Sequence, residues 1–191
     1  MKISVVLPVL ISHEWQFIMT ECCIRLMYSC TDIDFELIIV QTGEQNHDLV
    51  ELADKYIHFS ERSTPTKDVN AGIDAASGDY IIYIGNDIMV KPDWIEALAE
   101  CFAIDDCGIA TLACHEPGAV IGAKFPENTI TEGMYGPLMM FAQGWKFDES
   151  FESQCADNDL VMRIYASGKR AYRNNRVIVQ HLDGQTWETA Y

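Results

Sequence analysis

The sequence predicts an α/β protein in which a mostly parallel central sheet is flanked by helices. Continuous apolar segments rich in β-branched residues occur at 3–10, 35–40 and 79–84, as in strands that are covered on both faces. Segments with the apolar spacing of helices lie between them, which indicates right-handed crossovers between parallel strands. A length of 191 residues fits a single domain with its own core.

The first half of the chain is expected to alternate strand and helix. In order, the elements are a strand at 3–10, a helix at 12–30, a strand at 35–40, a helical stretch through Tyr56, a strand at 57–59 and a helix at 66–76. Ser12 is a suitable N-cap for the first helix, because its hydroxyl can accept from the first turn. Ser77 and Gly78 would close the last one, since glycine is favoured just beyond a helix C-terminus.

The second half is less regular. The strand at 79–84 leads to a helix at 92–103, which begins at Pro92, a residue favoured in a first helical turn. Residues 112–137 are rich in glycine and proline without periodicity, and we expect a loop-rich section there. The remaining elements are a strand at 136–141, a helix at 157–167 and a strand at 176–181 that delivers His181.

Three strand ends should meet at one edge of the sheet. They are Pro8-Val9-Leu10, Gln41-Thr42-Gly43 and Gly85-Asn86-Asp87. Ligands of open α/β sheets bind beyond the carboxyl ends of the strands. Asp87 is therefore either a cap for the helix after Pro92 or a working carboxylate in a cleft.

Two familiar phosphate-binding loops are missing from the sequence. The first strand ends in Pro-Val-Leu rather than in G-x-G-x-x-G, and no G-x-x-x-x-G-K-[ST] occurs. A diphosphate bound in this cleft would need a metal ion in place of a glycine-rich backbone cradle. Asp87 offers the hard oxygen ligand that suits Mg²⁺ or Mn²⁺.

Composition excludes some partners. The chain carries 29 acidic and 13 basic side chains, a net charge of −16, so general binding to nucleic acid or to anionic lipid is not expected. The basic residues Lys169, Arg170, Arg173 and Arg176 form either a local patch or a solvated edge.

Cysteine usage and hydropathy predict a soluble, cytoplasmic protein. The seven cysteines include no C-x-x-C pair, and no secretory leader or apolar run of about 20 residues is present. A zinc site at Cys101, Cys107 and Cys114 would have unusual spacings, and we expect buried thiols instead.

Five segments, in this order, resemble those of the inverting glycosyltransferases of family 2, which have the Rossmann-like GT-A fold. They are ISVVLPVL, ELIIVQTGE, NAGIDAASGDYIIYIGNDIMVKPDW, GWKFDESFESQCADNDLVMRIYASGKR and VIVQH, and they span residues 3 to 181. The resemblance implies one GT-A domain over 1–191. Its nucleotide-sugar-binding half would be 1–90, and its acceptor and catalytic half 91–191.

The resemblance also implies roles for individual residues. Asp87 falls on the last carboxylate of the family's metal motif and, with His181, would hold Mn²⁺ or Mg²⁺ against the donor diphosphate. Asp157 falls on the general base, which takes the proton of the acceptor hydroxyl. Asp159 would orient its helix or an acceptor hydroxyl. The other donor-binding residues that it implies are Pro8, Val9, Gln41, Thr42, Asn70, Gly85 and Asn86.

The implied reaction moves a sugar from a nucleoside-diphosphate sugar, with UDP as the expected nucleotide, to a hydroxyl of a glycan, a lipid-linked or another acceptor. Gln41 and Thr42 replace the family's Asp-Asp pair, which leaves the base open. Gly85 and Ala156 replace carboxylates, so a non-catalytic binding or scaffold protein is the alternative. A nucleotidyltransferase is disfavoured, because the first loop lacks glycines and lysine.

Acceptor recognition is the least defined part of the prediction. The sequence ends ten residues after His181, so we expect acceptor recognition either to be minimal or to be completed by a homo-oligomer or a partner. Trp145 and Tyr135 would either stack on a sugar or pin their loop.

Overall fold

The computed structural model of the chain describes residues 1–115, 128–134, 136–152 and 154–182. The helices are α1 (Glu14–Ser29), α2 (His47–Leu52), α3 (Pro65–Ala75), α4 (Trp94–Cys101) and α5 (Ala156–Ala166). The strands are β1 (Ile3–Leu10), β2 (Glu36–Thr42), β3 (Lys55–Phe59), β4 (Tyr80–Ile84), β5 (Ile88–Met89), β6 (Cys107–His115), β7 (Ile130–Glu132), β8 (Leu138–Ala142) and β9 (Arg170–His181).

The strands form one mixed sheet in the order β3-β2-β1-β4-β8-β6-β9-β5, with β7 paired to β9. The first four strands of that order are parallel, as the alternating sequence pattern predicts. β8 then runs antiparallel to both β4 and β6, whereas β6 and β9 are parallel. The α/β prediction is confirmed, and the antiparallel pairs lie mainly in the less regular second half.

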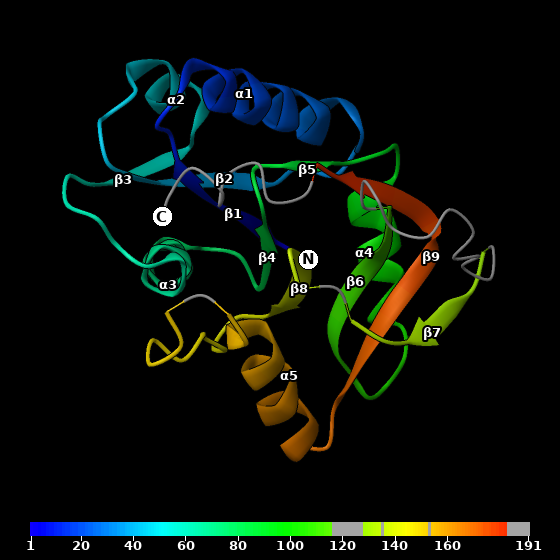
Figure 1. Cartoon of the computed structure of the whole chain (residues 1–191). Coiled ribbons are helices and arrows are strands. Elements are labelled where there is room, and N and C mark those ends of the chain that lie inside the picture. Colours follow the sequence, from blue (N-terminus) through cyan, green and yellow to red (C-terminus); the bar gives the residue numbers. More distant parts are fainter. Residues whose placement is uncertain (116–127, 135, 153, 183–191) are drawn as a thin grey trace.

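Helices cover both faces of the sheet, which explains why the strands are apolar throughout. Figure 1 shows α1 and α2 on one side of the sheet and α3 and α5 on the other. On β1, Val5 and Leu7 pack in the core cluster of α1, α2 and α4, while Val6 between them packs with α3 and α5. Trp94 is fully buried in the first cluster, as expected for a core residue.

Two predicted helix boundaries in the first half are wrong. The N-cap of α1 is His13 rather than Ser12. The side-chain oxygen of Gln16 accepts from the backbone N–H of both residues, at 2.7 Å from Ser12 and 3.0 Å from His13. The second helix ends at Leu52, and Tyr56 belongs to β3, because pairing with β2 outweighs its helical spacing.

Gly78 is not a helix cap either. The C-cap of α3 is Ala76. A Cβ at position 78 would lie 2.6 Å from the backbone nitrogen of Ser4, so this glycine allows β1 to approach the start of β4.

The second half contains more strand than predicted. β6 and β7 occupy parts of the chain where a loop-rich section or no element is expected, and β9 begins at Arg170 rather than near Arg176. β6 carries Gly108 and Thr111 among small residues, and its burial between β8 and β9 depends on pairing that no local pattern reveals. α4 begins at Trp94, after Pro92, with Asp93 as its N-cap.

The cysteine prediction fits the structure in part. All seven cysteines are free; Cys101 and Cys107 are buried as expected, whereas Cys114 is only partly buried. No helix in the part of the chain that the structure describes is long and apolar enough to cross a membrane.

Candidate functional site

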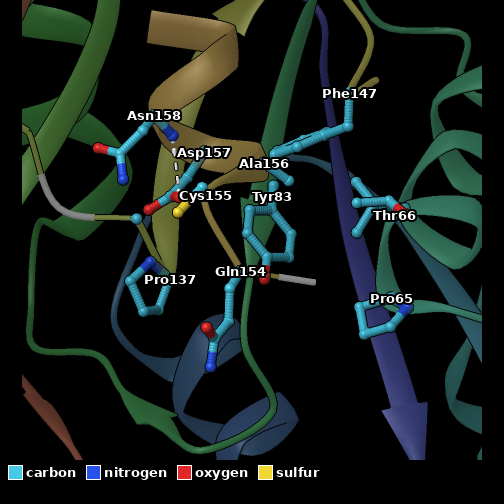
Figure 2. Close-up of a pocket in the computed structure, with 12 residues that line it drawn as sticks. Pro65, Thr66, Tyr83, Pro137, Phe147, Gln154, Cys155, Ala156, Asp157 and Asn158 are labelled. Atoms are coloured by element: carbon cyan, nitrogen blue, oxygen red, sulfur yellow. Dashed lines mark hydrogen bonds between the residues drawn. The ribbon is translucent and has the colours of Figure 1, made fainter. Parts of the chain in front are cut away.

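Two adjoining pockets lie at the carboxyl ends of β1, β2 and β4. The strand-end pocket, of about 400 Å³, is lined by Pro8, Val9, Leu10, Thr42, Arg62, Ser63, Thr64, Pro65, Asp68, Tyr83, Gly85, Asn86, Asp87, Pro137, Glu152 and His181. The helix pocket, of about 640 Å³, is lined by Pro65, Thr66, Val69, Tyr83, Gly136, Pro137, Phe147, Gln154, Cys155, Ala156, Asp157 and Asn158 (Figure 2). Both volumes are typical of ligand sites.

Asp87 and His181 meet in the strand-end pocket although they are far apart in the sequence. The short ladder between β5 and β9 pairs Ile88 with His181, and the backbone N–H of Leu182 donates to the Asp87 carbonyl at 3.0 Å. The His181 Nε2 and the Asp87 Oδ2 are therefore 3.2 Å apart. Asp87 is only 4% exposed.

Gly85 leaves space beside that carboxylate. A Cβ at position 85 would lie 2.9 Å from the Asp87 Oδ1. Asn86 also lines the pocket, but its side-chain amide donates to the hydroxyl of Thr20 on α1 at 2.9 Å. The amide therefore fixes the turn after β4 against α1, while the Asp87 Oδ1 stays accessible from the pocket side.

The chemistry of Asp87 and His181 fits a divalent cation. A carboxylate and an imidazole are ligands for Mn²⁺, and Mg²⁺ usually takes most of its remaining ligands from phosphate and water. The described residues contain no group of three or more His, Cys, Asp or Glu side chains that could hold a metal by themselves. Asp87 and His181 would hold such a cation, and a bound molecule could supply further ligands.

Asp157 lies in the helix pocket, in the first turn of α5. Its Oδ1 accepts from the backbone N–H of Asn158 at 2.9 Å. A Cβ at Gly136 would overlap with the Oδ2, so the glycine makes room for this carboxylate. Figure 2 shows Asp157 near Pro137 and across the pocket from Thr66. The Asp157 side chain is half-buried there.

Tyr83 joins the two pockets, and the sequence prediction missed it. Its ring lines both, and it packs edge-on against Phe147 with the ring centroids 5.5 Å apart. Burial raises the pKa of its phenol, and the negative charges of Asp87 and Asp157 raise it further. Tyr83 therefore lies within the electrostatic range of both carboxylates. In the sequence it reads only as a strand-former within YIIYI.

The residues predicted for base recognition are largely occupied within the protein. The Gln41 side-chain oxygen accepts from the Tyr56 hydroxyl at 2.6 Å and from the Asn46 N–H at 3.1 Å, and its NH₂ donates to the Glu44 carbonyl. Gln41 lines neither pocket, whereas Thr42 lines the strand-end pocket.

Asn70 braces the loop before α5. Its side chain donates to the Phe147 carbonyl at 2.9 Å and to Glu149 at 3.0 Å, and it accepts from the Phe147 N–H at 3.0 Å. It lines neither pocket, and it supports the helix pocket from behind through Phe147.

Two further polar residues of the strand-end pocket, Arg62 and Asp68, are absent from the sequence prediction. Asp68 lies in the first turn of α3, where it reads as an ordinary acidic residue near a helix N-terminus. Burial raises its pKa, against the opposing effect of the Ser63 and Thr42 hydroxyls.

Other candidates from the sequence have structural partners. Asp159 pairs with Arg163 one turn along α5, with 2.8 Å between Oδ2 and Nε, which fits a role in orienting the helix. Trp145 packs at the margin of the α3 and α5 core cluster. Tyr135 lies outside the described residues. Arg176 is balanced by Asp93 and Glu100, consistent with a solvated edge.

Comparison with known proteins identifies relatives of this fold. The model of the family described as Glycosyl transferase family 2 matches residues 5–161. No curated protein sequence matches the chain.

Among solved structures, S. aureus TarS covers 99% of this chain at 15% identity with a TM-score of 0.71, over 38% of its own length. TarS 1-349 in complex with UDP-GlcNAc covers 100% at 18% identity with a TM-score of 0.67, over 62% of that chain. The mannosyltransferase PcManGT from Pyrobaculum calidifontis, in complex with GDP-Man and Mn²⁺, covers 99% at 15% identity with a TM-score of 0.73, over 59% of that chain. The chain thus spans less than two thirds of these proteins, which share its fold.

Proposed function

The chain belongs to glycosyl transferase family 2, and on that premise we propose that it transfers a sugar, with inversion, from a nucleoside-diphosphate sugar to an acceptor hydroxyl. The observation that carries the proposal is the pair of adjoining pockets, with Asp87 and His181 in one, Asp157 in the other, and Tyr83 in both. A donor in the first pocket can thereby present its reacting carbon to an acceptor in the second.

Donor binding is assigned to the strand-end pocket and to the half of the chain within 1–90, completed by His181. Asp87 and His181 would hold Mn²⁺ or Mg²⁺, which neutralises charge on the departing nucleoside diphosphate. Pro8 and Val9 form the wall at the end of β1. Relatives of the same fold bind UDP, UDP-GlcNAc or GDP-Man, which supports a nucleotide-sugar donor.

Catalysis is assigned to Asp157. A hydroxyl is a poor nucleophile near neutral pH, so a carboxylate must accept its proton as it attacks the anomeric carbon. Asp157 suits this role because one of its oxygens is held by the Asn158 N–H while the other faces the space beside Gly136. The identity of the acceptor, a cytoplasmic location, and an oligomer or partner that completes the acceptor site stay predictions.

A non-catalytic binding protein of the same fold is the alternative, because Gly85 and Ala156 replace carboxylates found in the family. The retention of Asp87, Asp157 and His181 in the two pockets favours the enzyme.

The first test is a thermal-shift panel with UDP, GDP, dTDP and CMP, each with and without Mn²⁺. A nucleotide at 100 times its Kd should stabilise the folded protein by about 2.7 kcal/mol. We expect a shift with one diphosphate that requires Mn²⁺ and is lost in Asp87→Ala. Asp74→Asn, an exposed change on α3 outside both pockets, is the control. The absence of a shift with every nucleotide would contradict the proposal.

A further inference from the structure

Asp68 carries a buried carboxylate oxygen that nothing in the described protein satisfies. The residue is 6% exposed and lines the strand-end pocket. Its Oδ2 accepts from the Thr42 hydroxyl at 2.9 Å. Its Oδ1 is the one buried side-chain oxygen or nitrogen among the described residues that has no hydrogen-bond partner. The Ser63 hydroxyl lies nearby and favours the ionised carboxyl, against the effect of burial on its pKa.

An orphan oxygen of this kind is costly. Burial removes water from a carboxylate, and the loss is recovered only when hydrogen-bond donors replace that water. Since every other buried side-chain nitrogen or oxygen of the described residues is paired, the exception at a pocket wall indicates a donor that arrives with a ligand.

The position of Asp68 in the pocket restricts which part of a ligand it meets. Asp68 is bonded to the end of β2, whereas Asp87 follows β4, and β1 lies between these two strands. Two strand spacings separate the two ends of the pocket by about 10 Å. A carboxylate repels phosphate, so the diphosphate belongs at the end with Asp87 and His181, and the uncharged nucleoside belongs at the end with Asp68.

We propose that Asp68 accepts a hydrogen bond from an N–H group of the donor's nucleobase, and so determines which nucleoside diphosphate the strand-end pocket binds. This inference rests on the proposed function. It also accounts for Gln41, whose amide is already committed to Tyr56, Asn46 and Glu44 and is not available to read a base.

The chemistry of the bases makes this contact selective. Uracil presents one ring N–H between two carbonyl oxygens, guanine presents a ring N–H beside an amino group, and cytosine and adenine present amino groups. Thr42 holds the Oδ2, so the orientation of the carboxyl is fixed and only the Oδ1 accepts from the ligand. A base whose carbonyl faced this oxygen would be repelled.

The test is calorimetric titration of wild type and Asp68→Asn with UDP, GDP, CDP and ADP, each with Mn²⁺. Pyrophosphate with Mn²⁺ probes the diphosphate end alone. The matched control is Asp74→Asn, the same chemical change on the exposed side of α3. The melting temperature of each ligand-free variant reports on folding.

We expect Asp68→Asn to weaken the preferred nucleoside diphosphate at least tenfold and to reduce the preference among the four bases. Affinity for pyrophosphate should stay within twofold of wild type, and Asp74→Asn should match wild type throughout. The inference would be overturned if Asp68→Asn bound the preferred nucleotide as tightly as wild type does. It would also be overturned if the affinities for all four nucleotides and for pyrophosphate fell equally. Either outcome would leave the proposed function intact.

Two other outcomes are decisive. The first concerns the 2′-deoxy and 3′-deoxy forms of the preferred nucleotide. If one of them binds wild type as weakly as the intact nucleotide binds Asp68→Asn, and binds Asp68→Asn no more weakly than that, Asp68 bonds the ribose. The nucleobase assignment is then wrong. If wild type binds no nucleoside diphosphate, both the inference and the proposed function fail.

Discussion

The two ends of the parallel strands β1 to β4 differ in the hydrogen bonds that they give to a carboxylate. At the amino ends, Glu36 opens β2 and has partners on both neighbouring strands, β1 and β3, and in the turn before β4. Ser4 of β1 donates to it at 2.6 Å, Lys55 of β3 at 2.7 Å, and the Ser77 backbone before β4 at 2.9 Å. At the carboxyl ends, Asp68 accepts from the Thr42 hydroxyl and keeps an orphan oxygen.

The same contrast appears in their acidity. Burial disfavours ionisation of Glu36, but the hydrogen bonds from Lys55, Ser4 and Ser77 outweigh it and lower its pKa to about 2. At Asp68 burial prevails, and the pKa is raised. The amino ends of these strands therefore form a closed end, whose internal hydrogen bonds contribute stability. The carboxyl ends form an open end, whose polar groups are left for a ligand.

Replacing Asp157, the proposed general base, should have the largest effect on the rate of sugar transfer. Asp157→Asn keeps the shape of the side chain but cannot accept the acceptor's proton, so transfer should fall by about 10²–10⁴-fold. Nucleotide binding should persist, because Asp157 does not line the strand-end pocket. The measurement is initial transfer rate beside nucleotide affinity. Asp74→Asn, the same chemical change at an exposed position of α3, is the control; an Asp157 variant as active as this control would refute the assignment.

Displacing the Asp157 carboxylate should lower the transfer rate by less than replacing it. Gly136→Ala introduces a Cβ that overlaps with the Asp157 Oδ2, and the carboxylate must move. A displacement of about 1 Å lowers the rate by about 10²-fold when geometry limits the reaction. We expect the loss in transfer rate with unchanged nucleotide affinity. Equal activity in Gly136→Ala and wild type would show that the position of Asp157 is not critical.

Opening the closed end should affect stability and leave binding unchanged. Glu36→Gln removes the charge that Lys55 pairs with and weakens the bonds from Ser4 and Ser77. After allowance for solvent screening, we expect a loss of about 2 kcal/mol in the free energy of unfolding. Urea denaturation measures it, and nucleotide affinity at a temperature where both proteins are folded serves as the control. A loss of affinity as large as the loss of stability would remove the distinction between the two ends.

Local patterns in the sequence predict those parts of the fold that depend on residues close together along the chain. The apolar runs of β1, β2 and β4 identify the parallel strands, and the order of strand ends brings Asp87 to a pocket edge. Resemblance to a family adds Asp157 and His181. What the sequence does not predict depends on distant contacts, such as the burial of β6 between β8 and β9.

The missed site residues have the same origin. Tyr83 reads as a strand-former because its two carboxylate neighbours come from other segments. Asp68 reads as a helix-start carboxylate because the missing partner of its Oδ1 is visible only once the pocket is assembled. Gly78 reads as a helix cap, although the contact that requires it is with Ser4, on another strand. The spacing of residues along the sequence reveals none of these contacts.

The smallest effect expected is a gain in stability at the open end. Asp68→Asn removes a buried charge with an orphan oxygen, so the ligand-free protein should become more stable by about 1 kcal/mol at pH 7. Because the folded pKa of Asp68 is raised, its penalty is complete above that pKa and disappears as the pH falls below its ordinary value of 3.8. The advantage of Asp68→Asn over wild type should therefore vanish on acidification.

Glu36 should show the reverse sign in the same experiment. Its folded pKa is lowered, so its contribution is complete above the ordinary value of 4.5 and is lost as the pH falls towards about 2. Urea denaturation of wild type, Asp68→Asn and Glu36→Gln between pH 7 and pH 2 should thus give two differences of opposite sign that both shrink in acid. If Asp68→Asn is less stable than wild type at pH 7, its carboxylate is satisfied within the protein. The contrast between the two ends would then be one of location only.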